Sequence, residues 1–288
     1  MMLGQIEASC DYGPRRTAGL PPLSANSAVK LAFLLLSLSM PALADLTAGK
    51  QAAESGDYAT ALDELLPLAR QGNVVAQLKI GVMYSHGEGV SQDYKKAMQW
   101  YRLAASRGVA IAQSNLCIMY AEGLGGPRDY KEAARWCRSA ADRGNADAQL
   151  ELGIIEAQGL GGPQDYEKAV QWFRLAADQG NVDAQVNLGR MLVHGLGAPQ
   201  DYTEAAEWFR SAADQGNADA QLNLGIMYAQ GEGVPQDYVQ AHLWFSLAVG
   251  RGHSNGVKNR DMVARKMTPD QIAEAQRLAR EFRPQAGR

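Results

Sequence analysis

The sequence predicts an all-α fold, a solenoid in which antiparallel helix pairs are stacked in tandem. The dipeptide Asp-Tyr begins at residues 57, 93, 129, 165, 201 and 237, so that successive positions are 36 residues apart. A fixed period of this length is typical of stacked-repeat architectures. Aromatic residues make up only 7% of the chain and alanine is abundant, a composition that favours closely packed helices over sheets.

Composition and charge limit the classes of protein to which the chain can belong. The 288 residues carry a formal net charge of -3, from 28 Lys and Arg against 31 Asp and Glu. This balance excludes a basic nucleic-acid binder as the default interpretation. Hydrophobic residues make up 46% of the chain, which is enough to form a core.

The N-terminus has the pattern of a secretory leader. An apolar run at residues 31–40 is followed by an Ala-Leu-Ala motif ending at Ala44, which predicts a leader of residues 1–44 with a signal peptide cleaved after Ala44. The run is short for a membrane anchor, so we expect no stable membrane insertion after cleavage. An ordinary buried helix is the alternative. The first residues are too rich in Pro and Gly for a signal peptide, and we expect translation to start near Val29.

After the leader, the sequence divides into a short cap, a repeat array and a terminal helix. We expect a cap helix within 45–56, and a C-terminal capping helix and tail at 268–288, where Thr-Pro-Asp-Gln has the form of a capping box. Residues 57–272 contain six helix-pair repeats, the last of them degenerate. The repeats are 57–92, 93–128, 129–164, 165–200, 201–236 and 237–272.

Each repeat is expected to contain two helices separated by glycine, as repeat 201–236 illustrates. Asp201 is a good N-cap for the first helix, whose apolar residues recur at helical spacing. Gly216 ends this helix. The second helix begins near Asn217, and the Gly-Glu-Gly turn at 231–233 ends it.

One tryptophan lies on the apolar stripe of the first helix in five of the repeats. A single helix pair cannot bury its own apolar face, so we interpret these large side chains as the core that forms when repeats stack. The tryptophans assigned to the structural core are Trp100, Trp136, Trp172, Trp208 and Trp244. A ligand-stacking role is the alternative.

The first and last repeats depart from the common pattern. In the first, Glu64 stands in place of tryptophan and Pro67 lies inside the first helix. In the last, Arg260 and Asp261 replace an apolar Leu-Gly pair of the second helix. Repeat arrays need polar terminal units for solubility, so we interpret both as adapted ends.

These residues resemble the SEL-1-like repeat family, a relative of the tetratricopeptide repeat. The family pattern, A..W...AA..G...A...LG..Y..G.GV..D, matches from about residue 57 to 252 nearly without gaps. The resemblance implies a right-handed superhelical solenoid used for protein–protein interaction. For bacterial members it also implies export to the cell envelope, and roles as adaptors, as regulators of sensor proteins or in contacts with host proteins.

No constellation of catalytic or metal-binding residues emerges from the expected mature sequence. Some cysteine-rich relatives carry a β-lactamase label, but the Ser-x-x-Lys motif at residues 27–30 lies inside the predicted leader, without Ser-Asp-Asn or Lys-Thr-Gly. The Gly-x-Gly turns lack the lysine of a phosphate-binding loop. We therefore predict no enzymatic activity, cofactor or metal. The histidines, expected at the surface or in loops, are His86, His194, His242 and His253.

Two cysteines follow the predicted cleavage site. Cys117 stands where other second helices have glycine, and Cys137 stands where other first helices have an aromatic residue. One position has gained volume and the other has lost it, as two facing positions would. We predict that they face each other between neighbouring repeats and form a disulfide in an oxidising compartment. A pair of free buried thiols is the alternative.

A polar row on the first helices is the candidate partner-binding surface. Stacked helices of a solenoid present such side chains as an extended concave surface, and arginine is suited to binding carboxylates. The alternative is that the arginines form weak ion pairs with aspartates four residues later. The candidate residues are Gln99, Arg102, Arg135, Arg138, Gln171, Arg174, Glu207 and Arg210.

Together these patterns predict an exported, non-catalytic scaffold that binds a protein or peptide partner, with a periplasmic or secreted location, as a monomer. A second hypothesis is binding of saccharide or peptidoglycan fragments. With the tryptophans assigned to the core, only Tyr84, Tyr120 and Tyr228 remain as candidate aromatic contacts for a sugar. A β-lactamase-like or cell-wall hydrolase activity is a third hypothesis, which the missing motifs disfavour.

Overall fold

The structure, a computed structural model, describes residues 46–284, and its regular elements within this range are all helices. The predicted leader, its cleavage site after Ala44 and the expected start near Val29 lie outside the described residues. A helix at 46–54 comes first. It is followed by α2 (Tyr58–Arg70), α3 (Val74–His86), α4 (Tyr94–Ser106), α5 (Ala110–Glu122), α6 (Tyr130–Ala141), α7 (Ala146–Gln158), α8 (Tyr166–Asp178), α9 (Val182–His194), α10 (Tyr202–Asp214), α11 (Ala218–Gln230), α12 (Tyr238–Gly250), α13 (Ser254–Ala264) and α14 (Pro269–Glu281).

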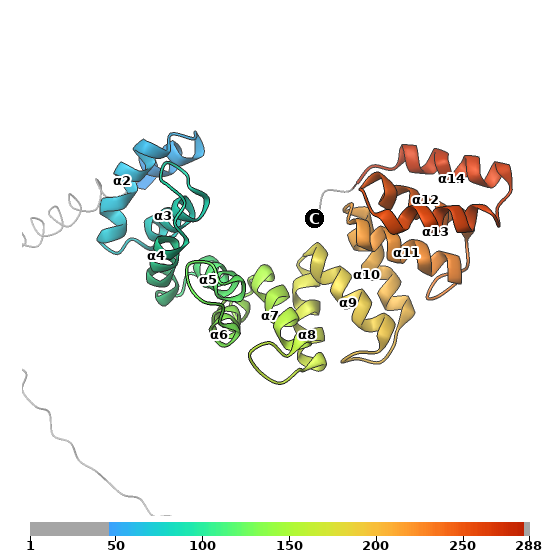
Figure 1. Cartoon of the computed structure of the whole chain (residues 1–288), viewed down its shortest axis with the longest axis horizontal. Helices are drawn as coiled ribbons and strands as arrows, with labels where there is room; N and C mark the ends of the chain where they lie inside the picture. Colours follow the sequence, from blue (N-terminus) through green and yellow to red (C-terminus); the bar gives the residue numbers. More distant parts are fainter. Residues whose placement is uncertain (1–45, 285–288) are drawn as a thin grey trace, which may run out of the picture.

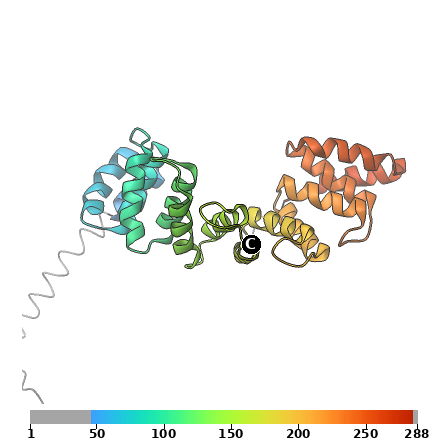
Figure 2. The ribbon, with the colours of Figure 1, turned by 60° about the horizontal axis from the view of Figure 1, so that its bottom comes forward.

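The helices form a tandem array of pairs. Each first helix packs on the second helix of its own repeat, and that second helix packs more extensively on the first helix of the next repeat. The array curves into an open arch, with α2 and α14 at its two ends (Figure 1), and the same curvature is visible after rotation (Figure 2). The all-α repeat superhelix predicted from the 36-residue period is therefore confirmed.

Aspartate and glycine define the helix ends. Asp201 is the N-cap of α10, where its carboxylate accepts a hydrogen bond of 2.9 Å from the backbone amide of Glu204. Gly231 ends α11 in the left-handed region, with φ of 76°. Gly233 has φ of 69°, and a side chain there would collide with the backbone of Tyr202. The Gly-x-Gly turns are thus helix connectors, as predicted.

The centre of the core is the residue that follows each tryptophan. Phe173, Phe209 and Phe245 are at most 2% exposed, and each ring packs on a glycine of the preceding second helix. A Cβ atom added to Gly225 would lie 2.6 Å from the Phe245 ring. Only glycine allows so close an approach in a densely packed interior.

Of the five tryptophans predicted to form the core, one is fully buried and four pack against its edge. Trp244 is 3% exposed, but the others are only partly buried and pack at the edges of the core clusters. The reason is that the position one residue later points into the contact between repeats. The partly buried residues are Trp100, Trp136, Trp172 and Trp208.

A buried glutamine in each of five second helices ties the two helices of a repeat together. In α9, Gln185 Nε2 donates to the carbonyl oxygen of Ala177 at 3.2 Å. This carbonyl, near the C-terminus of α8, also accepts the backbone amide of Gly180 at 2.9 Å, so the glutamine adds a second hydrogen bond to it. The equivalent residues are Gln77, Gln113, Gln149 and Gln221, with donor–acceptor distances of 3.0–3.1 Å.

The expected pair of facing cysteines lies between α5 and α6. Cys117 and Cys137 form a disulfide with their Cα atoms 5.0 Å apart, and both side chains are fully buried. They occupy the positions at which other repeats place the glycine and the phenylalanine ring. The bridge therefore substitutes for the aromatic contact between the second and third repeats.

The array ends differently at its two termini. At the N-terminal end, the helix at 46–54 covers the first repeat, and α2 continues past Pro67 to its end. At the other end, α14 starts with the predicted capping box of Thr268 and Gln271. It packs mainly along α12 rather than continuing the stack on α13 (Figure 1). Asp261 occupies the glycine position of α13, so no further aromatic ring can pack there.

Candidate functional site

The eight residues predicted to bind a partner all lie on first helices of consecutive repeats. Arg174 and Arg210 are partly buried, and the other six are exposed. We call this surface, together with the tryptophans of the first helices from α4 to α12, the first-helix face. It consists of Gln99 and Arg102 on α4, Arg135 and Arg138 on α6, Gln171 and Arg174 on α8, and Glu207 and Arg210 on α10, with Trp100, Trp136, Trp172, Trp208 and Trp244.

Two arginines of the first-helix face bind tyrosines of second helices. The Arg102 guanidinium donates to the Tyr120 hydroxyl at 2.7 Å and lies 5.7 Å from the centroid of its ring. Arg210 makes the same two contacts with Tyr228, 5.5 Å from the ring centroid. Neither arginine has an ion pair within residues 46–284. Because a phenol is neutral, these positions keep their positive charge.

The other three arginines of the face pair with glutamates, Arg135 with Glu132 of its own helix at 2.6 Å and the remaining two with glutamates of other helices. Arg138 contacts Glu156 of α7 at 2.5 Å, and Arg174 contacts Glu204 of α10 at 2.5 Å. The hydrogen bond from Arg174 holds the pKa of the Glu204 carboxyl below its ordinary value. The partners of Arg138 and Arg174 come from another helix, so the expectation of pairing with aspartates four residues later is wrong for both.

Guanidinium groups also lie over the indole rings. Arg135 is 4.5 Å from the ring centroid of Trp136, and Arg138 is 5.8 Å from that of Trp172 in the next repeat. Both distances are within the range of cation–π contacts. The face therefore combines aromatic surface and positive charge over consecutive repeats, a chemistry that suits aromatic and acidic side chains of a partner.

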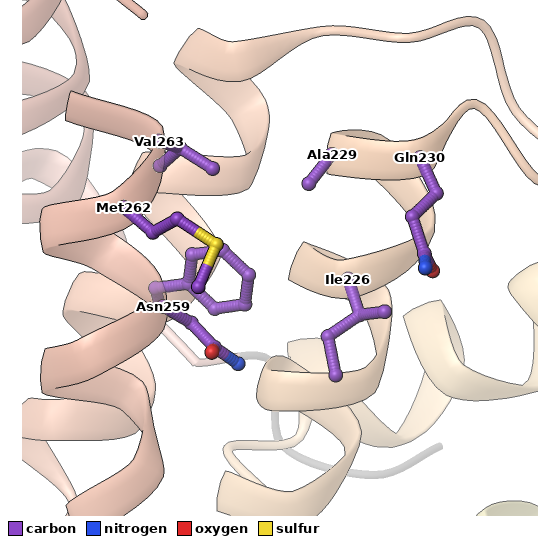
Figure 3. Close-up of a pocket in the computed structure, with 7 residues that line it drawn as sticks. Ile226, Ala229, Gln230, Asn259, Met262 and Val263 are labelled. Carbon is purple, nitrogen blue, oxygen red and sulfur yellow. The ribbon is translucent and has the colours of Figure 1, made fainter. Parts of the chain in front are cut away.

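A different kind of hollow lies between second helices. Between α11 and α13, a cavity of about 270 Å³ is lined by Phe245, with Ile226 and Met262 on its opposite sides (Figure 3). The equivalent cavity between α3 and α5 has a volume of about 510 Å³ and is lined by Tyr101 and Ile118. None of the predicted partner-binding residues lines either cavity.

The described residues assemble no metal centre: within 46–284, no group of three or more His, Cys, Asp or Glu could hold a metal ion. His242 is 4% exposed and is one of the buried residues of α12. The expectation that all four histidines lie at the surface or in loops is therefore wrong for this residue. Burial lowers the pKa of His242, because a charged ring is disfavoured away from water.

No helix within residues 46–284 is long and apolar enough to cross a membrane.

Comparison with known protein families identifies the repeating unit. The family model described as the Sel1 repeat matches residues 74–109, 110–145, 146–181, 182–217 and 218–253, which is well over half of the chain. Each match begins at the start of a second helix. Its register is therefore shifted by about half a repeat from the boundaries at the Asp-Tyr dipeptides.

A solved structure of a similar protein shares this architecture. The chain is 29% identical to a Sel1 repeat protein from Oxalobacter formigenes, with a TM-score of 0.71 over 84% of this chain and 99% of that one. It is 30% identical to a protective antigen of uropathogenic Escherichia coli strains that displays an SLR fold, with a TM-score of 0.47 over 83% of this chain and 68% of that one. A comparison with curated protein sequences finds no match.

Proposed function

Because the chain belongs to the Sel1 repeat family, whose members are generally protein-interaction scaffolds and typically non-catalytic, we propose that it is an exported scaffold of the bacterial cell envelope, acting as an adaptor or regulator. It binds a protein or peptide through the first-helix face. The observation that carries the proposal is the repeated contact between a guanidinium group and a partly buried aromatic ring on this face.

The charge of the face defines the partner's chemistry. Arg102 and Arg210 donate to phenols, so their charge is free to attract carboxylates. Leu103 and Leu175, on α4 and α8, are 49% and 47% exposed and add apolar surface to these helices. A partner with acidic and aromatic or aliphatic side chains fits this combination.

An envelope location is supported by two features of different origin. The first is the apolar run that ends in Ala44, which has the form of a signal peptide. The second is the disulfide between Cys117 and Cys137, because structural disulfides persist mainly in oxidising compartments. Fractionation followed by N-terminal sequencing tests the location. A processed chain that begins at Asp45 is expected, and an unprocessed cytoplasmic chain would contradict the proposal.

Partner capture from an envelope extract by full-length variants tests the binding surface. Arg102→Gln and Arg138→Gln together remove two positive charges, and the second change also leaves Glu156 without its ion-pair partner, which further disfavours an acidic ligand. If each charge-assisted contact contributes about 1.5 kcal/mol, affinity should fall about a hundred-fold, while the melting temperature changes little, because exposed ion pairs contribute little to stability. Arg190→Gln removes an exposed charge from α9 and is the matched control. Equal capture by all variants would exclude this surface.

Saccharide binding is a second candidate function, because the partly buried tryptophans leave indole surface accessible. Against it, guanidinium groups lie over the rings of Trp136 and Trp172, where a sugar would stack. A peptidoglycan pulldown separates the two functions. Retention that Trp136→Leu abolishes would favour a sugar ligand, whereas no retention beside capture of a protein would favour the scaffold.

A further inference from the structure

The first-helix face contains one cluster twice, three repeats apart. In each copy an arginine binds the tyrosine of its own repeat, and the tryptophan of the next repeat belongs to the same core cluster as that tyrosine. The copies are Arg102–Tyr120–Trp136 and Arg210–Tyr228–Trp244. In the two intervening repeats the tyrosine position is occupied by glutamate or leucine, so within this array the cluster is specific to these two places.

The chain itself covers the second copy. Phe282, directly after α14, meets Trp244 edge to face, with ring centroids 5.6 Å apart and an interplanar angle of 74°. Trp244 is 3% exposed, and its Nε1 is buried without a hydrogen-bond partner. The same indole position in the other copy, Trp136, is only partly buried. The tryptophan that α14 and Phe282 cover is thus fully buried, whereas the tryptophan of the uncovered copy is only partly buried.

The segment that covers the second copy is an amphipathic helix. Ile272, Ala275, Leu278 and Phe282 recur at helical spacing and are all buried or partly buried, while the residues between them are mostly exposed. The helix packs along α12 rather than extending the stack (Figure 1). It therefore covers α12, the first helix of the last repeat, as a bound helix of another protein would.

At the open copy, Arg135 lies over the ring of Trp136, and its side chain is 60% exposed. The corresponding residue of the covered copy is Leu243, which is 7% exposed. A long, exposed side chain can move aside when another ring approaches. Arg135 is paired with Glu132 at 2.6 Å, an exposed ion pair that costs little to break. The unpaired positive charge that favours a ligand with carboxylates at the open copy is that of Arg102.

We propose that the Arg102–Tyr120–Trp136 copy binds an amphipathic helix of a partner protein that presents an aromatic side chain to Trp136, as α14 presents Phe282 to Trp244. The inference rests on the proposed function, since it names the partner chemistry of the same face. The site lies on the same row of first helices as α12, to which α14 is already docked. The partner is a different protein, because α14 of every molecule of this protein already packs on α12 of the same molecule.

A synthetic peptide of residues 266–284, labelled and capped at both ends, is the probe, and fluorescence anisotropy with the purified full-length chain is the measurement. We expect saturable binding that Phe282→Ala in the peptide weakens about ten-fold, because an edge-to-face aromatic contact is lost. Arg135→Leu in the protein makes the open copy match the covered one and should tighten binding. Arg190→Gln is the control and should leave it unchanged.

Three results would overturn the inference: no binding, binding that Trp136→Leu leaves unaltered in a protein with native circular dichroism, or tightening by Arg135→Leu that persists with the Phe282→Ala peptide. Dimers that require both Phe282 and Trp136 would identify a second copy as the occupant and also overturn it. Failure of the peptide while Arg102→Gln with Arg138→Gln still abolishes partner capture would reject the inference and leave the proposed function standing.

Discussion

Replacing Phe209 with alanine should destabilise the array more than replacing the neighbouring Trp208, although tryptophan has the larger side chain. Phe209 is 1% exposed and its ring packs on Gly189 of α9. Trp208 lies partly buried at the edge of the same cluster, where its Nε1 donates to Glu204 at 3.1 Å. The comparison tests which residue of the pair joins one repeat to the next.

The magnitudes follow from burial. Phe209→Ala empties a closed site beside a glycine that has no side chain to fill it, and should cost about 3–5 kcal/mol. For Trp208, roughly two thirds of about 200 Å² of aromatic surface is buried, so its loss at about 25 cal/mol/Å² costs about 3.3 kcal/mol. The figure for Phe209 also includes a cavity term, which the open edge site of Trp208 lacks, so Phe209→Ala is expected to be the more destabilising variant.

Urea unfolding followed by far-UV circular dichroism measures the difference. Stacked repeats need not unfold in one step, so the comparison uses midpoints for variants of one repeat. Glu207→Ala, an exposed change on the same helix, is the control and should change stability by no more than about 0.5 kcal/mol. A midpoint for Trp208→Ala as low as that for Phe209→Ala, or lower, would refute the assignment of the core.

Three further outcomes are expected. Alkylation of the unfolded, unreduced chain should leave Cys117 and Cys137 unlabelled, and reduction should cost about 3 kcal/mol in the chain-entropy model, because the bridge spans a separation of 20 residues. Gln185→Leu should lower the free energy of unfolding by about 0.5–1.5 kcal/mol, because a buried hydrogen bond between the two helices of the repeat is lost. Burial, with Glu122 nearby, raises the pKa of Glu151, so stability falls as pH rises through that pKa. Glu151→Gln should therefore raise the melting temperature near neutral pH but not below pH ~4.

Each of these outcomes has a clear counter-result. Labelling of either cysteine before reduction would show free thiols and remove the bridge from the account. An unchanged urea midpoint for Gln185→Leu would mean that the hydrogen bond from Gln185 to Ala177 does not stabilise the repeat. An equal gain for Glu151→Gln at both pH values would assign the effect to packing instead of charge.

Local chemistry made the helix boundaries predictable from sequence. An aspartate such as Asp201 caps a helix through its own neighbours, and a glycine such as Gly231 adopts a left-handed conformation that other residues avoid. The capping box at Thr268 is local in the same way. The same capping residues recur from repeat to repeat, 36 residues apart. The architecture could therefore be predicted without knowledge of any contact.

The choice of core aromatic depends on a contact between repeats and could not be predicted from the stripe alone. Trp208 and Phe209 are adjacent, about 100° apart around the helix, and both lie on a broad apolar stripe. Only the position of Gly189 on the preceding helix decides which ring is enclosed. One signal was present nevertheless: Cys137 replaces the residue after Trp136, so the exchange of volume with Cys117 marks that position as the contact.

The contacts of the arginines required knowledge of the neighbouring helix. Arg102, Arg138 and Arg210 each bond the side chain 18 residues later, which is tyrosine in two cases and glutamate in the third. Spacing within one helix pointed instead to aspartates four residues away. The repeated separation of 18 residues was visible in the sequence, but its meaning depends on how the second helix packs against the first.

Photo-crosslinking from one position on each type of helix tests the binding surface most directly. A benzophenone amino acid is placed either at Gln171, exposed on α8, or at Gln158, exposed on α7, and the full-length chain is irradiated in an envelope extract. A discrete crosslinked partner from position 171, with none from 158, is the predicted result. Crosslinks of equal yield at both positions, or from position 158 alone, would contradict binding through the first-helix face.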